Sequence, residues 1–197
     1  MRVAVIGATG VIGKEVVKLL RSHKHEVLEA SRRSGDHRVD IQDPASIRAF
    51  YAALGQVDAV ICAAGGAAWK PLAQLDDADF EKSLHDKLMG QVNVIRYGAG
   101  AINAGGSITV TSGVLAQKPM PSSAAVSLVN AGLEGFTRAA ALELSGKVRV
   151  NCVSPPWIAE TLAAMGQNAT GAMTAAQAAL LYASAAEGNQ TGQIIAG

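Results

Sequence analysis

The strongest constraint on the fold is a glycine-rich segment near the N-terminus. VAVIGATGVIG places Gly7, Gly10 and Gly13 between a short apolar run and an amphipathic stretch. Glycine at these positions permits a tight turn off a strand, close approach of the backbone to a ligand, and close packing of the following helix. The free N–H groups at the start of such a helix bind phosphates. A dinucleotide is the expected ligand, although the same glycines also suit a tight turn without one. The candidate contacts are Gly7, Thr9, Gly10, Val11, Ile12 and Gly13.

Runs of β-branched residues alternate with amphipathic stretches along the rest of the chain. The expected strands are Val3–Ile6, Glu26–Ala30, Arg38–Ile41, Val57–Cys62, Ser107–Thr111, Val148–Val153 and Thr191–Ala196. The expected helices are Val11–Ser22, Pro44–Leu54 after an Asp43 N-cap, Asp79–Gly98, Ser122–Leu144 and one near Ala175–Ala185. This order predicts an α/β fold of the Rossmann type, with a doubly wound parallel sheet and helices on both faces. Neither a repeat nor a linker interrupts it, so a single domain over residues 1–197 is expected.

Composition argues against several classes of partner. The net charge is +1, with 49% hydrophobic and 17% charged residues, which gives no electrostatic reason to bind nucleic acid or an anionic membrane. No apolar run is long enough to span a bilayer, and the N-terminal apolar run ends in the glycine motif rather than in a signal-peptide pattern. Cys62 and Cys152 lie in apolar runs and are expected to be buried free thiols. We therefore expect a cytoplasmic protein without a metal site, with His23, His25 and His37 in surface loops.

The end of the second expected strand bears on the choice of nicotinamide cofactor. NAD sites usually carry an acidic residue there, which binds the ribose 2′-hydroxyl. This chain continues instead into Ser31, Arg32 and Arg33, and an arginine fork suits a 2′-phosphate. NADP(H) is the preferred cofactor, with Ser31 and Arg32 as contacts. NAD(H) stays open because Glu29 or Asp36 could reach the ribose, and both arginines could be ordinary surface charges.

Further motifs connect this chain to a known family. Ala63-Ala64-Gly65 follows the fourth strand, and SITVTSG, AGLEGFTRAAALEL, VRVNCVSPPWI and TGQII follow in order. With these segments the chain resembles the short-chain dehydrogenase/reductase family over essentially its whole length. The resemblance implies an oxidoreductase that acts on a small carbonyl or alcohol. It also implies cofactor contacts at Ala63, Ala64, Gly65, Pro155, Trp157 and Ile158. Asp40 and Ile41 could flank the adenine, although Asp40 could equally cap a loop.

Some motifs of the resemblance are altered. The usual Pro-Gly of the nicotinamide loop is Pro155-Pro156, and Thr161 stands one residue late. Trp157 could cover the nicotinamide ring or simply anchor its loop. The segment between this loop and the C-terminus is short, so we expect a small or open substrate pocket.

The catalytic residues implied by the resemblance are only partly present. Ser112 fits the serine that holds the substrate oxygen, but the usual tyrosine and lysine positions fall on Val126 and Asn130. The position that usually carries asparagine holds Lys87, so lysine and asparagine are exchanged between two facing helices. One hypothesis makes Lys87 a proton donor or electrostatic stabiliser with Asn130 as its partner. The other makes Lys87 a solvated surface residue on a catalytically silent NADP-binding sensor or regulatory protein.

Two smaller expectations complete the site and its partners. His85 is expected at the surface, and none of Tyr51, Tyr97 and Tyr182 is expected to replace the absent tyrosine. The helices at 79–98 and 122–144 are the ones that pair across the usual family dimer, and the second is apolar on nearly every side. A homodimer or homotetramer is therefore expected, with burial inside one subunit as the alternative.

Overall fold

The computed structural model describes residues 1–197, which form seven strands. These are β1 (Arg2–Ile6), β2 (Glu26–Ser31), β3 (His37–Arg38), β4 (Val57–Cys62), β5 (Ile102–Thr111), β6 (Arg149–Ser154) and β7 (Ile194–Ala196). They pair in parallel in the order β3-β2-β1-β4-β5-β6-β7. The predicted single-domain α/β fold with a parallel sheet is therefore confirmed.

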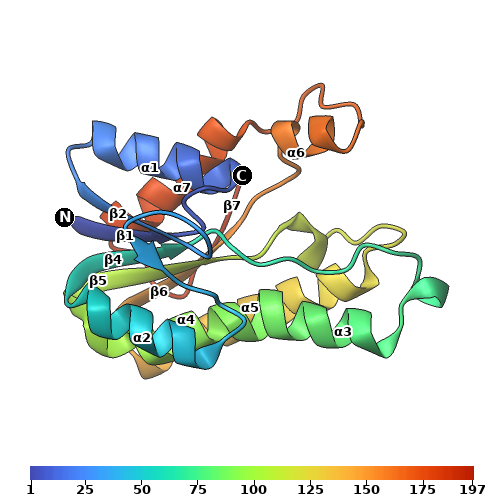
Figure 1. The fold of residues 1–197 in the computed structure, drawn as a ribbon. Coiled ribbons are helices and arrows are strands. Elements are labelled where there is room, and N and C mark those ends of the chain that lie inside the picture. Colours follow the sequence, from blue (N-terminus) through green and yellow to red (C-terminus); the bar gives the residue numbers. More distant parts are fainter.

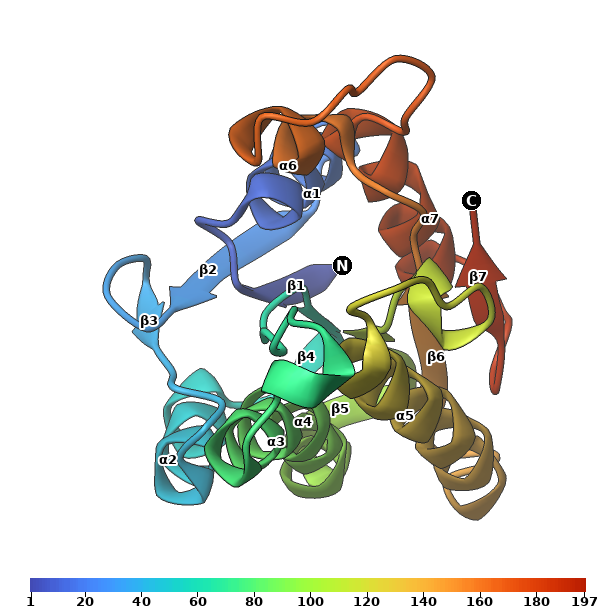
Figure 2. The same ribbon diagram turned by 90° about the vertical axis from the view of Figure 1, so that its right-hand side faces the viewer.

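Helices cover both faces of this sheet (Figures 1 and 2). One face carries α1 (Val11–Ser22) and α7 (Ala175–Glu187), and the other carries α2 (Pro44–Leu54), α4 (Gly90–Gly98) and α5 (Ala124–Glu143). Each face buries its own apolar cluster, of 14 residues under α1 and α7 and of 24 residues on the opposite side. Two shorter helices, α3 (Asp77–Ser83) and α6 (Ala159–Ala164), lie beyond the carboxyl ends of the strands (Figure 1). No helix is both long enough and apolar enough to cross a membrane.

Several element boundaries differ from the predictions, each for a local reason. β3 ends at Arg38 and does not continue to Ile41, because Asp40 forms side-chain-capped turns in which Gln42 N donates to Asp40 Oδ1 and Asp40 N donates to Ser46 Oγ. The helix expected from Ser122 begins at Ala124, because Ser122 has a φ of 71°, outside the helical region. The helix α6 was not predicted, and β5 begins five residues earlier than expected.

The helix expected over Asp79–Gly98 is divided into three parts. It begins at Asp77, since Asp76 and Asp79 form a reciprocal capping box. Residues Leu84–Met89 then form a π-helical turn, which carries Lys87, before α4 starts at Gly90. Such turns are rare and occur often at functional sites, because the wider turn changes the direction in which a side chain projects.

The strand order reverses at β1, and this reversal positions the candidate site. From β1 the chain runs outward through β2 and β3, then crosses to β4 on the other side. Ligands of open parallel sheets bind beyond the carboxyl ends of the strands at such a point. Ile6 pairs with Cys62, so Gly7 and Ala63 leave the sheet side by side. Both predicted buried thiols are confirmed, and burial raises the pKa of Cys62 and Cys152 to about 11.

Candidate functional site

The glycine turn leaves β1 with little space between its backbone and its surroundings. Gly7 has a φ of +84°, and a Cβ there would lie 2.6 Å from the Ala63 carbonyl oxygen. A Cβ at Gly13 would lie 2.0 Å from the Gly7 carbonyl oxygen. Gly10, by contrast, is exposed, and a Cβ there would meet only the Gly7 oxygen at 3.2 Å. Gly7 and Gly13 are thus required by packing, whereas Gly10 keeps an exposed backbone clear.

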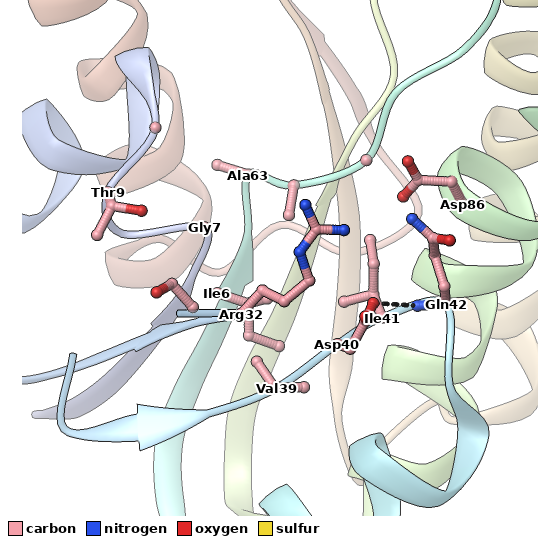
Figure 3. A pocket seen from close by; sticks show the side chains of 14 residues that line it. Ile6, Gly7, Thr9, Arg32, Val39, Asp40, Ile41, Gln42, Ala63 and Asp86 are labelled. Atoms are coloured by element: carbon pink, nitrogen blue, oxygen red, sulfur yellow. Dashed lines mark hydrogen bonds between the residues drawn. The ribbon is translucent and has the colours of Figure 1, made fainter. Parts of the chain in front are cut away.

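A cavity of about 280 Å³ lies beside this turn, at the carboxyl ends of β1, β2 and β4 (Figure 3). Ten of the predicted cofactor contacts line it: Gly7, Thr9, Gly10, Ser31, Arg32, Asp40, Ile41, Ala63, Ala64 and Gly65. Val11, Ile12 and Gly13 do not line it, since they already belong to the first turn of α1. Ile6, Val39, Gln42 and Asp86 line it without having been predicted. The cavity and the clear backbone at Gly10 fit the phosphate-bearing half of a dinucleotide.

Arg32 is the cation at this cavity. Figure 3 shows its side chain extending over the pocket between the glycine turn and the segment that carries Asp86. The two rival carboxylates are engaged elsewhere: Glu29 forms an ion pair with Arg21 at 2.8 Å, and Asp36 accepts a hydrogen bond from Glu29 N at 2.9 Å. Arg33 is exposed and does not line the cavity.

A second cavity, of about 160 Å³, lies at the end of β5. Its lining includes Ser112 and the predicted loop residues Pro155, Trp157 and Ile158, together with Thr161. Trp157 packs edge-on against Trp69 with ring centroids 5.4 Å apart, so Trp157 has the loop-anchoring contact that sequence reasoning left open. Sequence reasoning missed Trp69. A larger, open cavity of about 930 Å³ continues past Trp157 between the α6 segment and α7.

Lys87 is buried next to residues that line the two cavities, although it lines neither, so the interpretation of a solvated surface lysine is wrong. It exposes 9% of its surface, and its Nζ donates to the Ser112 carbonyl oxygen at 3.4 Å. On the other side it packs against the Ala63-Ala64-Gly65 loop, where a Cβ at Gly65 would lie 3.1 Å from Lys87 Cα. Lys87 forms no ion pair. Burial consequently lowers the pKa of its ammonium group. His85, two residues earlier, is exposed as expected.

Asn130 approaches the same segment from α5. Its side chain is 2% exposed, and a Cβ at Gly113 would lie 3.2 Å from its Nδ2 atom. The Oδ1 atom of Asn130 has no hydrogen-bond partner. The expected partnership of Lys87 with Asn130 is therefore not a direct hydrogen bond, because Lys87 bonds the Ser112 carbonyl instead. The two side chains nevertheless converge on Ser112–Gly113.

Glu134 completes this cluster, and sequence reasoning did not place it there. Ser112 Oγ donates to Glu134 Oε1 at 2.8 Å, and Gln117 Nε2 donates to Glu134 Oε2. Glu134 is only 4% exposed. With its proton directed to Glu134, the Ser112 hydroxyl has only lone pairs left for a ligand. The available signal was a carboxylate in a largely apolar helix, one turn after Asn130.

No tyrosine hydroxyl joins the cluster. Val126, at the position where the resembled family has tyrosine, is half-buried. The Tyr182 hydroxyl does come within 2.9 Å of Thr111 Oγ1, but Tyr182 is fully buried in the apolar cluster under α1 and α7. Tyr51 donates to the Val94 carbonyl. The polar side chains that meet at Ser112–Gly113 are therefore those of Ser112, Lys87, Asn130 and Glu134, without a tyrosine.

Comparisons with known proteins agree with this geometry. A model of the enoyl-(acyl carrier protein) reductase family matches residues 7–196. The crystal structure of the protein lin1944 from Listeria innocua is 33% identical and has a TM-score of 0.94, covering 100% of this chain and 98% of its own. A small-chain dehydrogenase solved in complex with NADPH is 28% identical, with a TM-score of 0.87 and coverage of 100% and 96%.

Two curated relatives are similar over part of their length. The hydroxynaphthalene reductase of Aspergillus fumigatus is 29% identical over 66% of this chain and 51% of its own, so the match spans about half of that protein. The 3-oxoacyl-[acyl-carrier-protein] reductase of Mus musculus is 27% identical over 79% of this chain and 74% of its own. The family match extends over nearly the whole chain, and the fold and glycine turn accord with it. This chain therefore belongs to the short-chain dehydrogenase/reductase family of oxidoreductases.

Proposed function

We propose that the protein is an NADP(H)-dependent oxidoreductase that acts on a small carbonyl or alcohol through an altered catalytic site. The observation that carries this proposal is the position of buried Lys87. It contacts the Gly65 loop of the dinucleotide cavity on one side and Ser112 of the second cavity on the other. A side chain placed in this way can serve the cofactor and the reacting oxygen together.

The cofactor would lie with its phosphates at Thr9 and Gly10 and its 2′-phosphate near Ser31 and Arg32. When bound, the nicotinamide supplies or accepts a hydride. The carboxylates of Glu29 and Asp36 are bonded to protein groups and do not line the cavity, so neither is placed to bind a ribose 2′-hydroxyl. This supports NADP(H) over NAD(H). The similar dehydrogenase solved with NADPH is in keeping with that preference.

The side chains supply complementary hydrogen-bonding groups for the substrate oxygen. A carbonyl oxygen needs a donor, and the Ser112 hydroxyl already donates to Glu134. The Lys87 ammonium is therefore the proton donor of the reduction, and its lowered pKa makes it a stronger acid than an exposed lysine. As the substrate oxygen takes a proton from Nζ, Lys87 becomes a neutral amine, which solvent reprotonates before the next turnover. Ser112 Oγ accepts a hydrogen bond from the alcohol that forms.

A second candidate function is a catalytically silent NADP-binding protein. Val126 stands where the family's proton-donating tyrosine is usual, and the Ser112 hydroxyl bonds Glu134 rather than facing the cavity as a free donor. The two candidates are separated by measuring NADPH binding by calorimetry and then NADPH oxidation across a panel of small carbonyl compounds. Binding with turnover supports the enzyme, and binding without turnover across the panel supports the silent protein. Failure to bind either nicotinamide dinucleotide contradicts both.

Arg32→Ala is expected to weaken NADPH binding by roughly 10- to 100-fold while changing NADH binding little. A charge-assisted hydrogen bond to a 2′-phosphate contributes about 1.5–3 kcal/mol, and NADH lacks that phosphate. Calorimetric titration with both cofactors measures the effect. Arg33→Ala is the matched control, because Arg33 is its exposed neighbour outside the cavity. Equal losses for NADPH and NADH, or a larger effect of Arg33→Ala, would contradict the assignment.

We also propose that α5 forms the interface of a homodimer or homotetramer, together with the segment at 79–98. Along one side of α5 the exposed residues are mostly apolar or small: Leu128, Ala131, Gly132, Gly135, Ala139 and Leu142. Leu128 and Leu142 are 51% and 80% exposed, although leucine is among the residue types that are most often buried. Small residues along a helix allow close approach of a second helix. In a two-fold symmetric dimer, the same α5 residues of both subunits would lie in the interface.

Leu128→Glu is expected to convert the oligomer to a monomer. A charge placed in a close helix–helix contact has to be buried without a partner, which costs several kcal/mol across two symmetric copies. Light scattering coupled to size exclusion measures the mass. Leu180→Glu on α7 is the control, since Leu180 is 55% exposed but lies away from α5. A wild-type monomer at working concentration would refute the interface.

A further inference from the structure

His23, His25 and Glu187 form a cluster remote from the dinucleotide cavity. One carboxylate oxygen of Glu187 lies 2.7 Å from His23 Nδ1 and 2.9 Å from His25 Nε2. The three ligand atoms lie within 4.8 Å of one another. The cluster joins the end of α1 and the start of β2 to the end of α7, two helices that lie side by side in Figure 1. The glycine turn stands at the other end of α1, about 18 Å away along a twelve-residue helix.

The backbone turn at the end of α1 brings the two histidines together. α1 ends at Ser22, His25 N donates to the Leu20 carbonyl, and Lys24 N donates to the Arg21 carbonyl. Lys24 has a φ of 62°, the left-handed conformation that commonly closes a helix. This turn reverses the chain within a single residue, so that both imidazoles reach the same oxygen. A His-Lys-His sequence in an extended strand could also place both rings on one side, but would not direct them back toward α7.

The chemistry of the cluster suits a transition-metal ion. Two imidazole nitrogens and a carboxylate oxygen are the ligands of many three-residue zinc sites, with solvent as the fourth ligand. Ligands of a tetrahedral zinc ion lie about 3.3 Å apart, so the three atoms need only small side-chain adjustments to surround one. The His25 side chain is 15% exposed, His23 is 40% exposed and Glu187 is 33% exposed, which leaves an entry path from solvent.

Both histidines hydrogen-bond to the same oxygen of Glu187. Burial alone would raise the pKa of Glu187, but hydrogen bonds from His23 and His25 outweigh it and lower that pKa. In the absence of metal these hydrogen bonds account for the geometry by themselves. A bound cation would replace both hydrogen bonds, with each neutral imidazole coordinating through its unprotonated nitrogen and keeping its proton on the other ring nitrogen.

We propose that His23, His25 and Glu187 bind one divalent transition-metal ion, Zn²⁺ in the first instance, which ties α1 and β2 to the end of α7. Glu187 is more than 160 residues away from the two histidines in the sequence, so the unfolded chain does not present the three ligands together. Metal binding therefore stabilises the folded state by mass action. This role is structural and does not depend on the proposed oxidoreductase activity.

The test uses tag-free protein stripped with EDTA, because an affinity tag would itself bind metal. Calorimetry with zinc chloride alone should give one site per chain. Thermal unfolding with zinc at about 100 times the dissociation constant should occur some 5–10 °C higher than in EDTA. His23→Asn and Glu187→Gln, singly and combined, should abolish this metal-dependent increment. His37→Asn, a histidine outside the cluster, should retain it.

The increase in unfolding temperature on adding zinc is the decisive quantity, because the variants also lose hydrogen bonds and are expected to be less stable in EDTA. Comparison of each variant with and without zinc removes that difference. The proposal is overturned by a wild type that shows no saturable one-to-one binding, or by variants that keep the same increment. NADPH affinity, measured with and without zinc, should be unchanged within a factor of about two. This measurement distinguishes a failure of the metal-site proposal from a failure of the dinucleotide-site proposal.

Discussion

Gly13→Ala is expected to reduce NADPH affinity at least about 100-fold and to destabilise the fold by about 1–3 kcal/mol. The added methyl carbon would lie 2.0 Å from the Gly7 carbonyl oxygen and 2.7 Å from the carbonyl carbon. Neither atom can move without shifting the turn, because Gly7 N is itself held by the Ala30 carbonyl at 2.9 Å. The start of α1 must therefore move away from β1, and the adjoining backbone of Thr9 and Gly10, which lines the cavity, moves with it. Urea unfolding and calorimetric titration with NADPH measure the two effects.

The Gly10→Ala variant tests whether the ligand approaches the backbone of this turn, without disturbing the packing of the turn. A Cβ at Gly10 meets only one protein atom, at 3.2 Å, so the loss of stability should stay below about 1 kcal/mol, the usual cost at a helix N-cap. Its NADPH affinity should nevertheless fall, since the methyl group occupies the side of the backbone that is free to meet phosphate. If Gly13→Ala binds NADPH as the wild type does, the cavity is not the dinucleotide site. If Gly10→Ala leaves NADPH affinity intact, the phosphates do not approach that backbone.

The fold could be predicted because its determinants are local. Apolar runs such as VDAVIC, the Asp43–Pro44 helix start and the glycine turn each specify one element by its own residues. The order of the elements then restricts a parallel sheet to very few topologies. The boundary errors arose where a side chain replaced a backbone partner, as at Asp40 and Asp76. Those hydrogen bonds depend on the final conformation and not on hydrophobic periodicity.

The candidate catalytic cluster could be predicted only in part, because it depends on contacts between distant segments. Ser112, Lys87 and Asn130 were identified by alignment to a motif, but the residue pattern predicted neither the π-helical turn that carries Lys87 nor the burial of its side chain. Glu134 was visible as one of the few charged residues on α5, yet only the structure shows that Ser112 donates to it. His23, His25 and Glu187 illustrate the same limit, since two neighbouring histidines meet a carboxylate from the other end of the chain.

Lys87→Met is expected to lower turnover by about 10²- to 10⁴-fold and to leave the protein at least as stable as the wild type. The first effect is the usual contribution of a positioned proton donor. The second follows because Lys87 is buried without an ion-pair partner, and replacing its ammonium by a thioether of similar length removes about 1 kcal/mol of desolvation cost. A purely structural lysine would show the opposite combination, with stability lost and turnover kept. Denaturant unfolding and NADPH oxidation measure the two quantities.

The pH dependence gives an independent check on Lys87. Its pKa is lowered from 10.5 in the folded state, so between that lowered pKa and 10.5 the unfolded chain binds more protons than the folded one. The contribution of Lys87 to the free energy of unfolding therefore increases as pH rises through this interval. The Lys87→Met variant should not show this increase. Carbonyl reduction should slow over the same range as the ammonium donor is lost.

Lys82→Met is the matched control, since Lys82 is an exposed lysine on the preceding helix. It should change neither turnover nor the pH dependence of stability. Equal turnover for wild type and Lys87→Met would show that another group donates the proton, and Glu134 would be the next to test. A lower stability of Lys87→Met at every pH would mean that the hydrogen bond to Ser112 outweighs the cost of burying the charge. In that case the lysine would be retained for the architecture of the site, because its ammonium would be holding the Ser112 segment in place.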